Sequence, residues 1–467
     1  MATDANASRI AGLVFCSLVE ADESGGYRPS LAESWSRLDD QTYEFRLRAG
    51  AFFHDGTPVT ADDVVATYRS VLDGAVASPK RAAMSSIGTV ESDGIDVVRM
   101  RLTQRSAAVL EAAGLGILPR ALAGRSNLNA RELVGCGPYR ILAVDEDQGV
   151  QLEAFPGWYG GTPALASLRF RVVPDSIMRV LELRYGSLHL VQNALEPDAV
   201  AYLAEHEPSL RVLLGPYDAV QYLSFRHDHP ALRDLRVRRA IAHAVDGKAI
   251  VTHVLRGQAR VATGLLPPHH WAFHGNVRTY DHDPSLARAL LDSAGIRDAD
   301  GDGPQPRLRL RYRTSTVELR RRIGEVLAAQ LAEVGIELEV QSHEWGTFFE
   351  DVRRGDFDLH SLAWIGIRDP DLFRLAFHSK MTPPAGSNRG RFADRVVDRL
   401  SERGQSTLDP ARRRRIYARL QRRTARLLPY VMLWWPNNVV VASARLDGFT
   451  PHPTGDLTGL ARARMRP

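Results

Sequence analysis

The sequence predicts an α/β protein, and one stretch of the chain shows this clearly. Residues 307–312 (RLRLRY) alternate apolar and charged side chains, as a half-buried strand does. Residues 319–334 repeat apolar side chains at helical spacing, Gly335 ends that helix, and residues 336–340 (IELEV) alternate again. A strand, a helix and a second strand in this order predict parallel neighbours. Ligands of α/β proteins bind at the carboxyl ends of such strands.

Other elements follow from local signals. Residues 43–50 (YEFRLRAG) predict another strand, and residues 345–349 and 357–364 predict a helix and a strand. Two capping boxes are predicted to begin helices, Thr60 with Asp63 and Ser315 with Glu318. Three Asp-Pro pairs predict helices in which Asp is the N-cap and Pro the first helical residue: Asp283–Pro284, Asp369–Pro370 and Asp409–Pro410.

Length and charge narrow the class of protein. The chain has 467 residues, which is too long for one core and predicts two or three domains. No run of 18 apolar residues is present, so no membrane-spanning helix is expected. The net charge is +5, and the densest basic run, residues 411–428, has apolar side chains at helical spacing. We interpret that run as an amphipathic helix with a solvated basic face, and we expect no nucleic-acid partner.

The chain has no nucleophile elbow, P-loop, HExxH motif or dinucleotide-binding fingerprint, so we expect a binding protein and not an enzyme. No metal or cofactor is expected. The loop at residues 298–303 (DADGDG) has calcium-loop spacing but Arg309 at the twelfth position, and the adjacent His269 and His270 do not converge on a metal. Cys16 and Cys136 are expected to be two separate buried thiols, with a disulfide as the alternative.

Several segments in order resemble one family. They are residues 31–73, GCGPY at 135–139 with a cysteine where the family has threonine, GWYGGTP at 157–163, residues 232–251, YDHDPSLARALLDSAG, LAAQLAEVGIELEV and GDFDL. Together they resemble the bacterial extracellular solute-binding proteins of family 5, the dipeptide-, oligopeptide- and nickel-binding group of ABC importers. The resemblance covers nearly the whole chain.

This resemblance implies a two-lobed periplasmic binding protein clamshell, class II-like and cluster C, with an extra subdomain in the first lobe. The expected division is residues 1–38, 165–235 and 436–467 for lobe I, 39–164 for the extra subdomain, and 236–435 for an α/β lobe II. The ligand is expected between the lobes, and closure would present it to the permease subunits of the transporter. We expect a monomer in the periplasm of a Gram-negative bacterium, with its leader peptide absent from this sequence.

The resemblance also points to ligand-binding residues. Peptide binders of the family typically have an aspartate after a Trp-x-Gly segment, where it pairs with the peptide's α-amine. Here Trp364 and Gly366 are followed by Ile367 and Arg368. A buried ammonium without a counter-charge is costly, so a standard free-amine peptide is disfavoured. Asp369 could serve instead, but its expected capping role competes.

Arg368 is the sharpest candidate, because a guanidinium at a strand end suits a carboxylate or phosphate. The other candidates come from neighbouring loops, aromatic walls and a first-lobe strand: Trp364, Ile367, Asp369, Asn388, Arg389, Trp345, Tyr222, Arg226 and Trp435. Arginines near the cleft would favour an anionic ligand.

The leading hypothesis is therefore a periplasmic substrate-binding protein of an ABC importer that captures a peptide or peptide-like solute, with an anionic one favoured by these arginines. The alternatives are a binding protein for nickel, a metal chelate or another non-peptide solute, or the ligand-sensing domain of a transcriptional regulator. The last would need a DNA-binding segment before residue 1.

Overall fold

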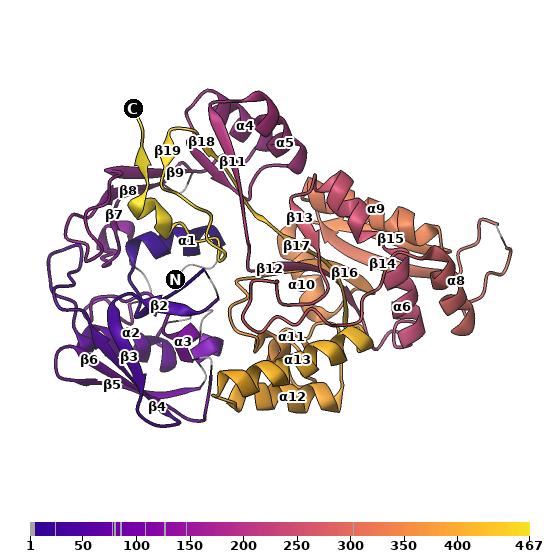
Figure 1. Ribbon diagram of the computed structural model, residues 1–467, viewed down its shortest axis with the longest axis horizontal. Coiled ribbons are helices and arrows are strands. Elements are labelled where there is room, and N and C mark those ends of the chain that lie inside the picture. Colours follow the sequence, from indigo (N-terminus) through magenta and orange to yellow (C-terminus); the bar gives the residue numbers. More distant parts are fainter. Residues whose placement is uncertain are drawn as a thin grey trace.

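The computed structural model describes residues 5–23, 25–76, 78, 81–84, 86–107, 109–125, 128–145, 147–301 and 303–467. It has two lobes side by side, and the C-terminal segment returns to the lobe that contains the N-terminus (Figure 1). The fold is mixed α/β. None of the helices in these ranges is long and apolar enough to cross a membrane.

The lower part of the first lobe is an antiparallel sheet with the strand order β3-β4-β6-β5. Its strands are β3 (Ala32–Arg37), β4 (Thr42–Leu47), β5 (Ile87–Asp93) and β6 (Val97–Leu102), and helix α2 (Ala61–Leu72) packs on β5 and β6. The strand predicted at residues 43–50 is confirmed as β4. The capping box is also confirmed, because the Asp63 carboxylate accepts the Thr60 backbone N–H at 2.9 Å.

The rest of the first lobe contains two three-stranded sheets, β7-β8-β9 and β10-β18-β11. Their strands are β7 (Tyr139–Asp145), β8 (Gly149–Ala154), β9 (Ser167–Arg171), β10 (Leu190–Gln192), β11 (Leu210–Gly215) and β18 (Asn438–Ser443). The remaining elements are α1 (Ala5–Val14), β1 (Val19–Ala21), β2 (Tyr27–Pro29), α3 (Val109–Ala112), α4 (Ser176–Arg184), α5 (Pro197–His206), β19 (Leu446–Asp447) and β20 (Arg464–Met465). Strand β18 comes from the end of the chain and is the central strand of its sheet.

The second lobe is built on a six-stranded sheet with the order β13-β17-β12-β16-β14-β15. Its strands are β12 (Ala219–Phe225), β13 (Ala259–Val261), β14 (Leu308–Ser315), β15 (Ile336–His343), β16 (Leu359–Ile365) and β17 (Tyr430–Pro436). Its helices are α6 (Leu235–Ala244), α7 (Gly247–Ala249), α8 (Pro284–Ser293), α9 (Glu318–Ala332), α10 (Trp345–Arg354), α11 (Leu372–Phe377), α12 (Arg395–Ser406) and α13 (Pro410–Leu427).

The predicted strand–helix–strand unit is confirmed as β14, α9 and β15. Strand β14 pairs in parallel with both β15 and β16, so three strands end at one edge of the sheet. The predicted cap of α9 is wrong. The N-cap is Val317, and Ser315 remains in β14 with 1% of its surface exposed, because the strand continues further than the local signal suggested.

Strand pairing runs across three of the expected lobe borders. A border at residue 38/39 separates β3 from its partner β4, and one at 164/165 separates β8 from its partner β9. A first-lobe segment ending at residue 235 would include β12, which lies within the second-lobe sheet. The chain therefore crosses between the lobes at residues 216–218 and again at Asn437, next to the expected border at 435/436. Pairing between distant strands leaves no local mark in a sequence.

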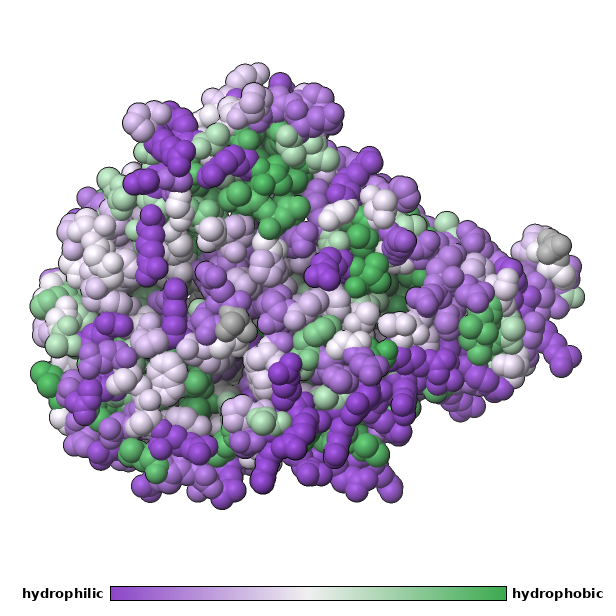
Figure 2. Space-filling view, in the orientation of Figure 1, coloured by the Kyte–Doolittle hydropathy of each residue, from purple (hydrophilic) through white to green (hydrophobic). Residues whose placement is uncertain are grey.

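Two of the three predicted Asp-Pro helix starts are confirmed. The Asp283 carboxylate accepts the Leu286 N–H at 2.9 Å at the start of α8, and Asp409 accepts the Arg412 N–H at 2.7 Å at the start of α13. The predicted amphipathic character of α13 is confirmed as well, because Arg412 and Arg415 are exposed whereas Ile416 is buried. Figure 2 shows the hydrophilic edge of the molecule where α12 and α13 lie.

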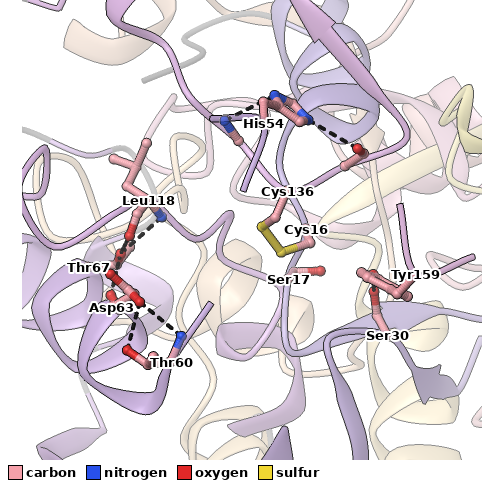
Figure 3. The surroundings of a disulfide bond; sticks show 12 residues. Cys16, Ser17, Ser30, His54, Thr60, Asp63, Thr67, Leu118, Cys136 and Tyr159 are labelled. Carbon is pink, nitrogen blue, oxygen red and sulfur yellow. Dashed lines mark hydrogen bonds between the residues drawn. A yellow bond between two sulfur atoms is a disulfide. The ribbon is translucent and has the colours of Figure 1, made fainter. Parts of the chain in front are cut away.

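Cys16 and Cys136 form a disulfide, with their Cα atoms 5.2 Å apart (Figure 3). The prediction of two separate thiols is wrong, because the segments around them approach unusually closely. A Cβ atom on Gly135 would lie 2.0 Å from the Val14 carbonyl oxygen, and one on Gly137 would lie 2.5 Å from that of Leu13. Only glycine on both sides of Cys136 permits this approach.

Candidate ligand-binding cleft

A cavity of about 1040 Å³ lies against the first lobe and reaches the loop after β16. Residues of α1, β1, α3 and the segment 114–118 line it from the first lobe, and Gly366 and Arg368 line it from the second. Ligand pockets typically measure about 300–1,000 Å³. The cavity is therefore large enough for a small peptide or a comparable solute.

Arg368 and Glu111 bring opposite charges into this cavity from different lobes. The Arg368 Nη1 atom lies 3.9 Å from Glu111 Oε1, and each side chain is 31% exposed. The Tyr27 hydroxyl donates to the other Glu111 oxygen, Oε2, at 2.7 Å. Burial disfavours the charge on Arg368, but Glu111, Tyr27, Asp218 and Asp456 together raise its pKa. The guanidinium is thus held charged, without a hydrogen-bonded carboxylate among the described residues.

The backbone on either side of Arg368 is braced by the two adjacent histidines. His270 Nε2 donates to the Arg368 carbonyl oxygen at 2.9 Å, while its Nδ1 accepts the Ala272 N–H at 3.0 Å. Burial lowers the pKa of His270 to about 4, so the ring is neutral near pH 7 and fits both roles. His269 Nε2 lies 2.6 Å from the Asp218 carboxylate, whose backbone carbonyl accepts the Ile367 N–H at 3.0 Å.

Asp369 is occupied by an arginine from α13. Arg413 donates to both Asp369 oxygens, at 2.6 and 2.8 Å, and its side chain is only 6% exposed. The predicted N-cap at Asp369 is wrong, because α11 begins two residues later than predicted, at Leu372, with Asp371 as its N-cap. The Asp369 Oδ1 atom also accepts the Asp371 N–H at 2.7 Å, so this carboxylate holds the turn before α11 while it neutralises the buried Arg413. In this arrangement Asp369 is not available to a ligand amine.

A row of alternating arginine and aromatic side chains lies at the carboxyl edge of the second-lobe sheet. We call Arg320, Trp345, Phe349, Arg389 and Trp364 the arginine–aromatic row. Arginine Cζ atoms lie 4.9 Å from the Trp345 ring centre, 5.3 Å from that of Phe349 and 5.7 Å from that of Trp364. The Trp345 and Phe349 rings stack between the two arginines, with centres 5.6 Å apart.

Three predicted site residues belong to this row: Trp345, Trp364 and Arg389. Sequence reasoning missed Arg320 and Phe349. Arg320 lies in the first turn of α9, and Phe349 lies about one turn after the start of α10. These positions would have been the signal, because the helices that directly follow parallel strands begin at the edge of the sheet where ligands bind. Ser315, which ends β14, accepts a hydrogen bond from Arg320 Nη1 at 3.3 Å.

The remaining predicted residues lie elsewhere. Tyr222, Ile367 and Trp435 are 1%, 3% and 6% exposed and pack in the second-lobe core, with Tyr222 stacked behind Trp364 at 6.2 Å. Asn388 is 1% exposed and bonds to the carbonyl oxygens of His378 and Phe392, which shapes the loop before Arg389. Arg226 pairs with Asp228 and contacts the Gly355 carbonyl oxygen.

Comparison with known proteins identifies the family to which this chain belongs. Residues 26–382 match the family model described as bacterial extracellular solute-binding proteins, family 5 Middle. The chain belongs to this family. Its members are non-enzymatic solute-binding components of ABC transporters.

Individual relatives agree over nearly the full length. The oligopeptide-binding protein AppA of Bacillus subtilis is 27% identical over 98% of this chain and 88% of its own length. Its structure in complex with a nonapeptide is similar at a TM-score of 0.86 and 26% identity, covering 100% of this chain and 95% of that one. The structure of AgaA from A. tumefaciens R10 in complex with agropinic acid has a TM-score of 0.82 at 25% identity, covering 99% and 94%.

Proposed function

We propose that this protein is the periplasmic solute-binding component of an ABC importer and captures a peptide or peptide-like solute that bears a carboxylate. The observation that favours this function is the meeting of Arg368 from the second lobe with Glu111 from the first lobe in one large cavity. The relatives support the substrate class, since AppA binds a nonapeptide and AgaA binds agropinic acid.

Charge complementarity explains how a solute would be held. The Arg368 guanidinium suits a carboxylate, and Glu111 suits an ammonium or amide N–H group. Glu111 would thus supply the acid that peptide binders of the family place where this chain has Ile367. The two groups lie 3.9 Å apart and share no hydrogen bond, so a zwitterionic group could pair with both.

Binding and closure would be linked by the same two residues. A solute that touches both lobes binds the closed arrangement better than the open one and shifts the population toward closure. The two crossings, at residues 216–218 and Asn437, are the points about which the lobes would rotate. The closed form would then be presented to the permease subunits, with the protein acting as a monomer in the periplasm of a Gram-negative bacterium.

Native mass spectrometry of freshly purified protein would identify a co-purified solute, and titration calorimetry with that solute would test the two residues. We expect Arg368→Ala and Glu111→Gln each to weaken binding at least tenfold, since a hydrogen bond to a charged group contributes about 1.5–3 kcal/mol. Arg309→Ala is the matched control, because Arg309 is 74% exposed near the opposite end of β14. Unchanged affinity in both cleft variants would refute the proposal.

A further inference from the structure

The carboxyl edge of the second-lobe sheet exposes apolar side chains where three strands end together. Val317, Trp345 and Ile365 follow or end β14, β15 and β16, and they are 50%, 45% and 55% exposed. Parallel strands place these positions at the same edge. Figure 1 shows α10, which begins at Trp345, on the side of the second lobe nearer the first lobe. The edge therefore belongs to the face across which the lobes meet.

The two arginines of the arginine–aromatic row have no carboxylate partner among the described residues. Neighbouring acids are occupied: Glu318 pairs with Arg321, Glu350 pairs with Arg353, and Glu344 accepts the Gly346 N–H at 3.0 Å. Most of the second-lobe arginines near this edge do have carboxylates, as Arg313 does with Asp356. Arg320 and Arg389 are thus exceptions within their own surroundings.

The polar contacts of these two arginines are with hydroxyl groups: Arg320 Nη1 donates to Ser315 at 3.3 Å, and Arg389 interacts with the buried Tyr222 hydroxyl. The remaining N–H groups have no carboxylate among the described residues. A guanidinium stacked on a ring contacts it with its face, while its N–H groups point outward in its own plane. A half-buried guanidinium without a counter-charge is costly unless a ligand supplies one. Carboxylates accept from guanidinium in the bidentate geometry that such a planar group offers.

We propose that the arginine–aromatic row is a second subsite of the cleft, which binds two carboxylates of an acidic peptide-like solute, one at Arg320 and one at Arg389. This inference rests on the proposed function. It adds a substrate class, because Arg368 and Glu111 would recognise a zwitterionic group of any such solute, whereas the row selects solutes with further negative charge. The exposed Trp345 ring lies between the two carboxylate positions and contacts the intervening chain of the solute.

The test uses two sets of synthetic tripeptides and tetrapeptides that are identical except that every Glu and Asp of one set is Gln or Asn in the other. Each set is offered to the whole protein, retained peptides are identified by native mass spectrometry, and the best binder and its amide twin are measured by calorimetry. The acidic peptide is expected to bind at least tenfold more tightly than its twin.

Arg320→Gln and Arg389→Gln should each reduce this preference about tenfold and leave the affinity for the amide twin unchanged. Arg389→Lys retains the charge and should retain most of the preference, and Arg309→Gln, near the other end of β14, should change nothing. Thermal melts check that each variant is folded. Binding of both sets with equal affinity, or a preference that survives both glutamine variants, would overturn this inference and leave the proposed function standing. Retention of no peptide from either set would overturn both.

Discussion

Removal of the Cys16–Cys136 disulfide should destabilise the first lobe by an amount set by the loop that it closes. The bonded residues are 120 positions apart. In the chain-entropy relation, a loop of this length lowers the entropy of the unfolded chain by about 16 cal/mol/K, which corresponds to about 5 kcal/mol at 25 °C. The bond lies within the core that includes Phe45, Tyr68 and Leu115. Its loss should therefore weaken β4 and β6 more than the second-lobe sheet.

A double-mutant cycle tests this reasoning. Cys16→Ala, Cys136→Ala and the double variant all lack the same bond, so the entropic account predicts nearly equal losses of about 4–5 kcal/mol for all three. Hydrogen exchange by mass spectrometry would measure the free energy of opening of β4 and β6, with β14 and β15 as the internal control. Reductant should affect the wild type and leave the double variant unchanged.

Two results would refute the account. If the losses of the single variants add up in the double variant, each cysteine stabilises the core by its own packing and the bond contributes little. If β14 and β15 weaken as much as β4 and β6, the two lobes unfold as one cooperative unit and the loop argument does not locate the effect.

Three further outcomes are expected. Burial lowers the pKa of His270 to about 4, below the roughly 6.5 of an unfolded chain, so the unfolded state takes up the proton first as the pH falls. The free energy of unfolding should therefore fall by about 3 kcal/mol between pH 6.5 and 4. Thermal melts of His270→Gln should show a shallower pH dependence over that window. Asp369→Asn should cost about 3–5 kcal/mol in urea unfolding by leaving buried Arg413 unpaired, whereas pairing it with Arg413→Met should restore much of the loss. Gly135→Ala should destabilise strongly in the same assay, since the new Cβ would meet the Val14 carbonyl; a loss below about 1 kcal/mol would contradict the close approach.

Local signals in the sequence predicted local structure well. The alternation around Leu310 and the helical spacing that followed it correctly indicated β14, α9 and β15, and the Asp283 and Asp409 pairs correctly indicated helix starts. Two residues whose roles were predicted wrongly have a partner distant in the sequence. Asp369 pairs with Arg413, and Cys16 pairs with Cys136.

The candidate site was likewise predicted only in part. Arg368 was predicted from its place after a strand, and that place is what brings it to the cavity. The aromatic and tyrosine candidates could not be sorted by residue type alone, since Trp345 is 45% exposed whereas Tyr222, from the central strand β12, is 1% exposed. Arg320 escaped notice because a sequence does not show that the neighbouring acids Glu318, Glu344 and Glu350 take other partners in the folded chain.

The position of β18 has a consequence for how the protein is made. Strands β10 and β11 do not pair with each other; each pairs only with β18 (Asn438–Ser443), which is synthesised after all the strands of the second-lobe sheet. That sheet cannot form before β18 has been made, so β10 and β11 stay unpaired while the ribosome synthesises the second lobe. The order of strands in this sheet therefore makes completion of the first lobe depend on a segment that is made after the second lobe.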